Sequence, residues 1–303
     1  MDVVTALQEV AAPVTSPEVA VCALQLEMRR PNETILESLQ RGLEGMTRVA
    51  CQQKIDLFVL PELSPVGYSE DTFARFLPKT PALQEVYRKI DDAFANQARI
   101  LRTFICYGTV GWIFRPNGSL GFSIRQNVLD RTGRLVASYD KIHFCDYGDC
   151  AETHFFEAGP RAAPVSFSID GFRFGLLICA DMRNPTLSRS LVRDHKVDVL
   201  LQPAAFARDV SFRTWKSFRE TRAVENSVYF IGVNYAGEAF GETSVVPPWV
   251  DELHEPLVMG RPEGYLVGRI QRSTLNMVRT TMPFYRQICA EGETKSSFTG
   301  TSR

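Results

Sequence analysis

Four short runs of the chain are apolar at nearly every position, and this pattern constrains the fold most. They are LFVL at 57–60, GLLI at 175–178, VDVLL at 197–201 and VYFIGV at 228–233. A strand with one face in water alternates apolar and polar residues, whereas a strand covered on both faces is apolar throughout. We therefore expect these runs to lie inside sheets that are covered on both sides.

Helical patterns separate the strand-like runs. Residues 32–54 carry Ile35, Leu39 and Leu43 on one face, and Asn32 is the expected N-cap. Further helices are expected at 81–100, 185–195, 214–227 and 272–280, and further strands at 19–27, 56–62, 103–114, 172–180 and 263–270, with two more in 123–144 joined at DRTG. Strands that alternate with helices predict a layered α/β architecture, and strands of mixed polarity such as RLVASYDK predict mixed sheets.

Composition excludes several classes of partner. The formal net charge of the 303 residues is −1, so no bulk charge favours nucleic acid or an anionic membrane surface. No apolar run approaches the roughly 20 residues that span a bilayer, and the N-terminus lacks the pattern of a signal peptide. We expect a cytoplasmic protein with no nucleic-acid or membrane partner. The absence of Gly-rich dinucleotide and phosphate-binding motifs predicts no cofactor.

The seven cysteines give no sign of a disulfide framework. They are an odd, scattered set without C-x-x-C pairs, at positions 22, 51, 106, 145, 150, 179 and 289. His143, Cys145, Cys150 and His154 form a loose group, but their spacing fits no standard zinc pattern. The sequence therefore predicts no metal site and mostly reduced, buried thiols.

Three ionisable residues fall at the ends of predicted strands: Glu62, Lys141 and Cys179. Considered one at a time, the cysteine is expected to be a buried core thiol, and the glutamate and the lysine are expected to be solvated surface groups. Ligands gather at the carboxyl ends of strands in α/β folds, so the three can also converge. A thiolate nucleophile, a carboxylate that moves protons and an ammonium that stabilises an oxyanion suffice for acyl transfer.

Several blocks then carry a family resemblance. DLFVLPELSPVGY (56–68), QNVLDRTGRLVASYDK (126–141), YDKIHFCD (139–146), CAETHFFEAG (150–159), FGLLICADMRNP (174–185), LLQPAAF (200–206) and WKSFRETRAVENSVYFIGVN (215–234) resemble those of the nitrilase, or carbon–nitrogen hydrolase, superfamily. They occur in that family's order. The resemblance covers roughly residues 18–285.

The resemblance implies an α/β fold, a four-layer α-β-β-α sandwich with mixed sheets, and a Glu-Lys-Cys triad. Glu62 matches the general base, Lys141 the lysine and Cys179 the nucleophile. Glu152 matches a second glutamate that positions substrate or lysine, although alone it also reads as an ion-pair partner. The Ala180 N–H would complete the oxyanion site. The domain is expected at 18–286, between flexible segments at 1–17 and 287–303.

The residues after the cysteine, CADMRNP, favour an amide substrate. They are similar to the amidase branches, including the omega-amidase-like group, whereas nitrilases typically have Cys-Trp-Glu here. The resemblance implies hydrolysis of a small linear amide through a thioester. An N-carbamoyl amine or amino-acid hydrolase, a nitrilase and a non-catalytic metabolite-binding homologue remain as alternatives.

Four further residues are candidates for the substrate pocket: Tyr68, Met182, Arg183 and Phe206. Arg183 can pair with a substrate carboxylate in a bidentate manner or cap helix carbonyls, and the other three also read as core. The resemblance implies a homodimer or a larger homo-oligomer, with the helices near 185–195 and 214–227 as the expected interface.

Overall fold

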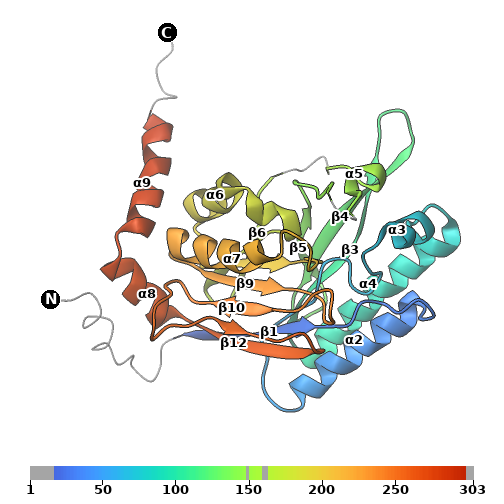
Figure 1. Ribbon diagram of the computed structural model, residues 1–303, viewed down its shortest axis with the longest axis horizontal. Helices are drawn as coiled ribbons and strands as arrows, with labels where there is room; N and C mark the ends of the chain where they lie inside the picture. The colour runs from blue at the N-terminus through green and yellow to red at the C-terminus, as the bar shows by residue number, and fades with distance from the viewer. Residues whose placement is uncertain (1–16, 148–149, 159–162, 298–303) are drawn as a thin grey trace, which may run out of the picture.

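The structure is a computed structural model that describes residues 17–147, 150–158 and 163–297. Two six-stranded sheets lie at its centre, and helices cover their outer faces (Figure 1). The predicted four-layer α-β-β-α sandwich with mixed sheets is therefore confirmed. Of the flexible segment expected at 1–17, all but Pro17 lies outside the described residues.

The first sheet has the strand order β12-β1-β2-β3-β4-β5. Its parallel strands are β1 (Glu18–Gln25), β2 (Leu57–Val59) and β3 (Phe104–Phe114), and its antiparallel strands are β4 (Leu120–Leu129), β5 (Leu135–Asp140) and β12 (Gly264–Gln271). The last strand of the chain thus pairs with the first. This pairing brings the C-terminal part back to the sheet that carries Glu62 and Lys141 at the ends of its strands.

The second sheet has the strand order β11-β10-β9-β8-β7-β6. Its parallel strands are β7 (Phe172–Leu176), β8 (Val199–Pro203) and β9 (Tyr229–Val233), and its antiparallel strands are β6 (Ser166–Ile169), β10 (Ser244–Val246) and β11 (Leu257–Val258). Every residue of β2, β8 and β9 is buried. Their continuous apolar sequences are explained by cover on both faces.

The helices form the two outer layers. Those over the first sheet are α2 (Ile35–Ala50) and α4 (Pro81–Leu101), and those over the second are α6 (Pro185–His195) and α7 (Arg213–Asn226). The remaining helices are α3 (Glu70–Phe76), α5 (Glu152–Phe155), α8 (Arg272–Thr281) and α9 (Phe284–Ser297). In the part of the chain that is described, no helix combines the length and apolarity needed to cross a membrane.

Several boundaries differ from expectation, and two of them have a clear physical reason. The first helix begins at Ile35, and its N-cap is Thr34 rather than Asn32. Thr34 Oγ1 accepts the Glu37 N–H while the Glu37 carboxylate accepts the Thr34 N–H, so a capping box fixes the start. At the other end, a flexible tail was expected at 287–303. Residues 287–297 continue helix α9, in which Ile288 is only 2% exposed because it packs into the core, and residues 298–303 lie outside the described residues.

Gly108 of β3 determines how closely this strand approaches the segment that carries Glu62. A Cβ atom at position 108 would lie 2.2 Å from the Leu63 backbone nitrogen and 2.8 Å from its Cα atom. Neither backbone atom can move aside as the end of a flexible side chain can. The missing side chain therefore lets the Glu62–Leu63 segment lie directly against the strand.

We predict that Gly108→Ala lowers the free energy of unfolding by about 1–3 kcal/mol, because the added methyl group displaces the backbone beside Glu62. Gly45→Ala in helix α2 is the matched control, since a Cβ atom there meets nothing within 4 Å. It should raise the free energy of unfolding by roughly 0.5–1 kcal/mol. Urea denaturation measures both, and a Gly108→Ala protein as stable as the parent would contradict the prediction.

Candidate active site

Three buried charged side chains meet at the end of the first sheet. Glu62 follows β2, Lys141 directly follows β5, and Glu152 is the first residue of α5. All three are 0% exposed. Lys141 Nζ lies 2.8 Å from Glu62 Oε1 and 2.6 Å from Glu152 Oε1. The lysine thus bridges two carboxylates that approach from different segments.

The second sheet holds the Glu62 carboxylate from the opposite side. Its Oε2 atom accepts the backbone N–H of Ala205, which follows β8, at 3.0 Å. The hydroxyl of Tyr235, just beyond β9, donates to the Glu62 backbone carbonyl at 2.7 Å. These bonds fix both the backbone and the carboxylate of Glu62, so its free motion is small.

Glu152 is fixed by its own set of donors. The Cys145 N–H donates to Glu152 Oε2 at 2.8 Å, and the Tyr68 hydroxyl donates to Oε1. Lys141 completes the set, so both oxygen atoms of a fully buried carboxylate are satisfied. The structure thus brings Glu152, which was expected to position substrate or lysine, into contact with Lys141.

Cys179 lies on a sharp turn rather than at the end of a strand. The strand expected over 172–180 ends at Leu176, and a 3₁₀-helix covers Cys179–Arg183. Cys179 has φ +43°, a left-handed conformation that is unfavourable for a residue with a Cβ atom. Its carbonyl accepts Gln202 Nε2 at 2.6 Å, which holds the turn against β8. The thiol residue is 6% exposed.

Asp181 ties this turn to the segment after β5. Its buried carboxylate accepts the Ile178 N–H at 3.0 Å, the Tyr139 hydroxyl at 2.7 Å and the His143 N–H at 2.9 Å. The sequence reasoning did not select Asp181. The feature of the sequence that could have indicated Asp181 is its position: it is an acidic residue two positions after Cys179, just beyond a strongly apolar run.

Burial dominates the ionisation of the site. It raises the pKa of Glu62 to about 7, although the Lys141 charge acts in the opposite direction. Burial also disfavours charge on Lys141, but the carboxylates of Glu152 and Glu62 outweigh it and raise the lysine pKa well above its ordinary value. Burial and the Glu62 carboxylate raise the pKa of the Cys179 thiol, against the effect of Lys141. The resting site therefore holds a cationic lysine, a thiol and a carboxyl that ionises near neutral pH.

A small cavity lies above the thiol. Its volume is about 20 Å³, room for roughly one water molecule. It is lined by Tyr68, Cys145, Tyr147, Cys150, Cys179, Ala180, Arg183, Ala205, Phe206, Ala207, Asp209 and Ser211. Sequence reasoning selected Tyr68, Ala180, Arg183 and Phe206 among these. It did not select Tyr147, Asp209 and Ser211, which lie in loops without a periodic pattern.

Met182 does not line this cavity. Its side chain is 0% exposed and packs in the hydrophobic core, and its carbonyl accepts Arg222 Nε of α7 at 3.0 Å. Arg183, the next residue, points the other way: its guanidinium bonds to the Tyr147 hydroxyl and, at 3.1 Å, to Ser211 Oγ. The 3₁₀ turn thus separates two neighbours that the sequence had grouped together.

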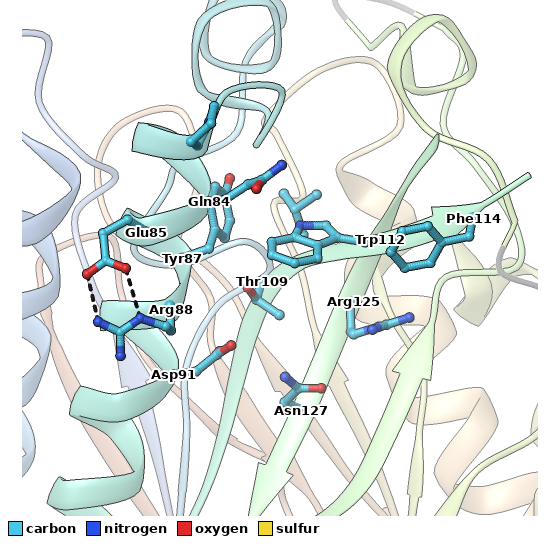
Figure 2. Close-up of a pocket in the computed structure, with 12 residues that line it drawn as sticks. Gln84, Glu85, Tyr87, Arg88, Asp91, Thr109, Trp112, Phe114, Arg125 and Asn127 are labelled. Atoms are coloured by element: carbon cyan, nitrogen blue, oxygen red, sulfur yellow. Dashed lines mark hydrogen bonds and ion pairs between the residues drawn. The ribbon is translucent and has the colours of Figure 1, made fainter. Parts of the chain in front are cut away.

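A larger cavity of about 660 Å³ lies elsewhere, between α4 and strands β3 and β4 (Figure 2). Its charged groups are engaged, since Arg88 pairs with Glu85 at 2.7 Å and Arg125 pairs with Asp140 at 2.7 Å. Its lining contains no cysteine, serine, histidine or lysine. Cavity size therefore does not locate the chemistry in this molecule.

No group of three or more His, Cys, Asp and Glu side chains that could hold a metal ion occurs in the described ranges. An ammonium and two carboxyls, whose charges act on Cys179, form the buried bridge, and the Cys179 thiol lines the small cavity. This set can perform nucleophilic attack, proton transfer and stabilisation of a developing negative charge.

Comparison with known proteins identifies the family of the chain. The sequence profile of the family described as Carbon-nitrogen hydrolase matches residues 18–280. The chain belongs to this family. It is a hydrolase of carbon–nitrogen bonds with the nitrilase-superfamily fold.

Similar relatives include amidases. The chain is 28% identical over 276 residues to deaminated glutathione amidase of Synechocystis, covering 86% of this chain and 94% of that protein. It is 29% identical over 250 residues to human omega-amidase, covering 79% and 85%. The crystal structure of Nit3 of Saccharomyces cerevisiae superposes with a TM-score of 0.72 at 22% identity, covering 90% of this chain and 97% of that one.

We predict that Lys141→Met lowers the free energy of unfolding by about 3–5 kcal/mol, because Glu62 and Glu152 lose their buried counter-ion. The decrease in the free energy of unfolding caused by Lys141→Met should become larger as pH rises. Burial holds the pKa of Glu62 above that of the unfolded chain, and loss of the ammonium that opposes this shift makes its ionisation favour unfolding more strongly.

Urea unfolding at pH values below and above about 7, the pKa of Glu62, measures this dependence. Lys89→Met on the exposed face of α4 is the matched control and should change little at either pH. Equal stability of Lys141→Met and the parent above pH 7 would contradict the role of the lysine as counter-ion.

Proposed function

We propose that the chain is a cysteine-dependent amidohydrolase that cleaves the C–N bond of a small linear amide through a thioester. The observation that carries this proposal is the bridge of Lys141 between Glu62 and Glu152, fully buried beside the strained Cys179 turn. Strained turns and perturbed pKa values concentrate at functional sites. Packing alone has no need of three buried charges.

Glu62 is the proposed general base. Its pKa of about 7 lets it take the Cys179 proton at neutral pH as the sulfur attacks the amide carbonyl. The thiol is protonated at rest, because burial and the Glu62 carboxylate raise its pKa. Attack and proton transfer therefore occur together, and no stable thiolate is needed beforehand.

Lys141 and the Ala180 N–H are the proposed stabilisers of the tetrahedral oxyanion. Lys141 remains charged through the reaction because two carboxylates raise its pKa. Glu152 touches the lysine but not Cys179, so we assign it a positioning role: it holds the Nζ atom in place. A pre-oriented donor in a water-poor site stabilises the oxyanion without reorganisation of solvent.

Collapse of the tetrahedral intermediate breaks the C–N bond. Protonated Glu62 gives its proton to the departing ammonia or amine, which leaves a thioester on Cys179 and Glu62 as a carboxylate. Glu62 then takes a proton from water as the water attacks the thioester. Collapse of this second tetrahedral intermediate breaks the C–S bond, the carboxylic acid product leaves, and Glu62 returns the proton to the Cys179 sulfur.

The narrowness of the cavity and the nature of its lining favour a substrate with a small acyl group. Tyr68, Tyr147 and Phe206 supply aromatic walls, and Arg183 supplies a cation at the rim for a substrate carboxylate. An amidase from Nesterenkonia, 22% identical with a TM-score of 0.71, has been solved as variants in complex with butyramide and with an acetamide moiety covalently added at its active-site cysteine. The likeness of fold and the shared family support an amide as the substrate here.

Ammonia release over a panel of amides, N-carbamoyl amino acids and nitriles, each with and without a terminal carboxylate, tests the proposal. We expect release from small amides, with lower KM values for those that carry the carboxylate. Cys179→Ala should abolish turnover, whereas Cys51→Ala, a change of an exposed thiol, should not alter it. Release only from carbamoyl compounds or nitriles would overturn the substrate class, and an active Cys179→Ala protein would overturn the mechanism.

The pH profile tests the role of Glu62. We predict that kcat/KM rises with pH through about 7, because only the ionised carboxyl accepts the thiol proton. Glu62→Gln should lower kcat about 10²- to 10⁴-fold and remove this acid limb. Glu44→Gln on the exposed face of α2 is the matched control and should leave the profile unchanged. A parent profile that is flat from pH 5 to 9 would contradict the assignment.

A further inference from the structure

Two further cysteines line the cavity that contains Cys179. Cys145 is buried, Cys150 is half-buried, and both are free thiols. Backbone hydrogen bonds bring their segments together: Cys150 N–H donates to the Tyr147 carbonyl at 3.2 Å, and Glu152 N–H donates to the Cys145 carbonyl at 3.3 Å. The proposed mechanism uses neither thiol.

The two thiols are hydrogen-bonded to each other, and they differ in acidity. The hydrogen bond from Cys145 lowers the pKa of Cys150, burial opposes the shift, and the Tyr68 hydroxyl, 3.7 Å from Cys150 Sγ, lowers it further. The same thiol–thiol bond, followed by burial, raises the pKa of Cys145. Cys150 is thus the more acidic of the two thiols, and Cys145 is the partner whose proton is harder to remove.

We propose that Cys145 and Cys150 form an oxidation site that reacts with hydrogen peroxide to give a reversible disulfide at the wall of the catalytic cavity. The geometry carries this assignment: two free thiols line the same cavity, and one is half-buried while the other is buried. Such pairs, in which an accessible thiolate lies beside a resolving cysteine, are the type that redox-sensing proteins use.

The chemistry balances with peroxide as the oxidant. The Cys150 thiolate attacks one peroxide oxygen, which forms the S–O bond of a sulfenic acid, breaks the O–O bond and releases hydroxide. Cys145 sulfur then attacks Cys150 sulfur, which forms the S–S bond and breaks the S–O bond. The second hydroxide leaves with the Cys145 proton as water, and the first takes up the proton that Cys150 had lost to solvent. One peroxide and two thiols therefore give one disulfide and two waters.

The disulfide would act on the neighbouring carboxylate. The Cys145 N–H holds Glu152 Oε2, and the Tyr68 hydroxyl lies between Glu152 Oε1 and Cys150 Sγ. Drawing the two sulfurs into a covalent bond moves both contacts, and Glu152 in turn positions Lys141. We expect the oxidised protein to lose activity, an expectation that rests on the proposed function, whereas disulfide formation itself does not.

Peptide mapping tests the bond directly. Trypsin releases residues 142–161 as one peptide that contains Cys145 and Cys150 and no other cysteine, and residues 174–183 as another that contains Cys179. The full chain is treated with stoichiometric peroxide, unfolded, alkylated with iodoacetamide and digested. We expect the first peptide to be two hydrogen atoms lighter and without alkyl groups, while Cys179 is alkylated and dithiothreitol reverses the change.

Two cysteine variants distinguish oxidation at Cys145 and Cys150 from oxidation at the catalytic thiol of Cys179. Cys150→Ser should block the disulfide, and the activity that this variant has before treatment should resist the same peroxide dose. Cys51→Ser, a change at an exposed thiol, should form the disulfide and lose activity as the parent protein does. Alkylation of both Cys145 and Cys150 after treatment, or a cross-link between Cys150 and Cys179, would overturn the proposal. A disulfide in a chain that hydrolyses none of the panel would uphold the oxidation site and overturn the proposed function alone.

Discussion

The bridge of Lys141 between Glu62 and Glu152 is the interaction on which the rest of the site depends. An ion taken out of water without a partner costs several kcal/mol, and none of these three side chains is exposed. Each charge is therefore stable only with the others present. The same burial moves the pKa of Glu62 to about 7, so the constraint on stability is also the source of a base suited to neutral pH.

The sandwich assembles this cluster from both sheets. The first sheet supplies Glu62 and Lys141 at strand ends, while the second supplies the Cys179 turn after β7 and the Ala205 N–H after β8. Tyr235 links the two across the core by donating to the Glu62 carbonyl. The site residues therefore come together when the two sheets pack against each other. This explains why residues that are distant in the sequence lie close together in the site.

The sequence predicts the layers well because their signals are local. Runs such as LFVL and VYFIGV are apolar throughout, and α4 and α6 begin and end close to the predicted residues. Elements of two to four residues, such as β11 and α5, are too short to show a period, and neither was predicted. Met182 was grouped with residues that line the small cavity, although it does not line it, because sequence spacing cannot tell which side of a 3₁₀ turn faces the cavity. Asp181 was missed because its role depends on three donors from two segments.

In the proposed mechanism, Cys179, Glu62 and Lys141 act as one unit that forms and hydrolyses a thioester. Mass spectrometry of the protein quenched during turnover of a small amide detects this intermediate. We expect the acyl group on the tryptic peptide 174–183 at Cys179, and none in Cys179→Ala. Steady turnover with no acyl group on Cys179, or an acyl group on another residue, would contradict this mechanism.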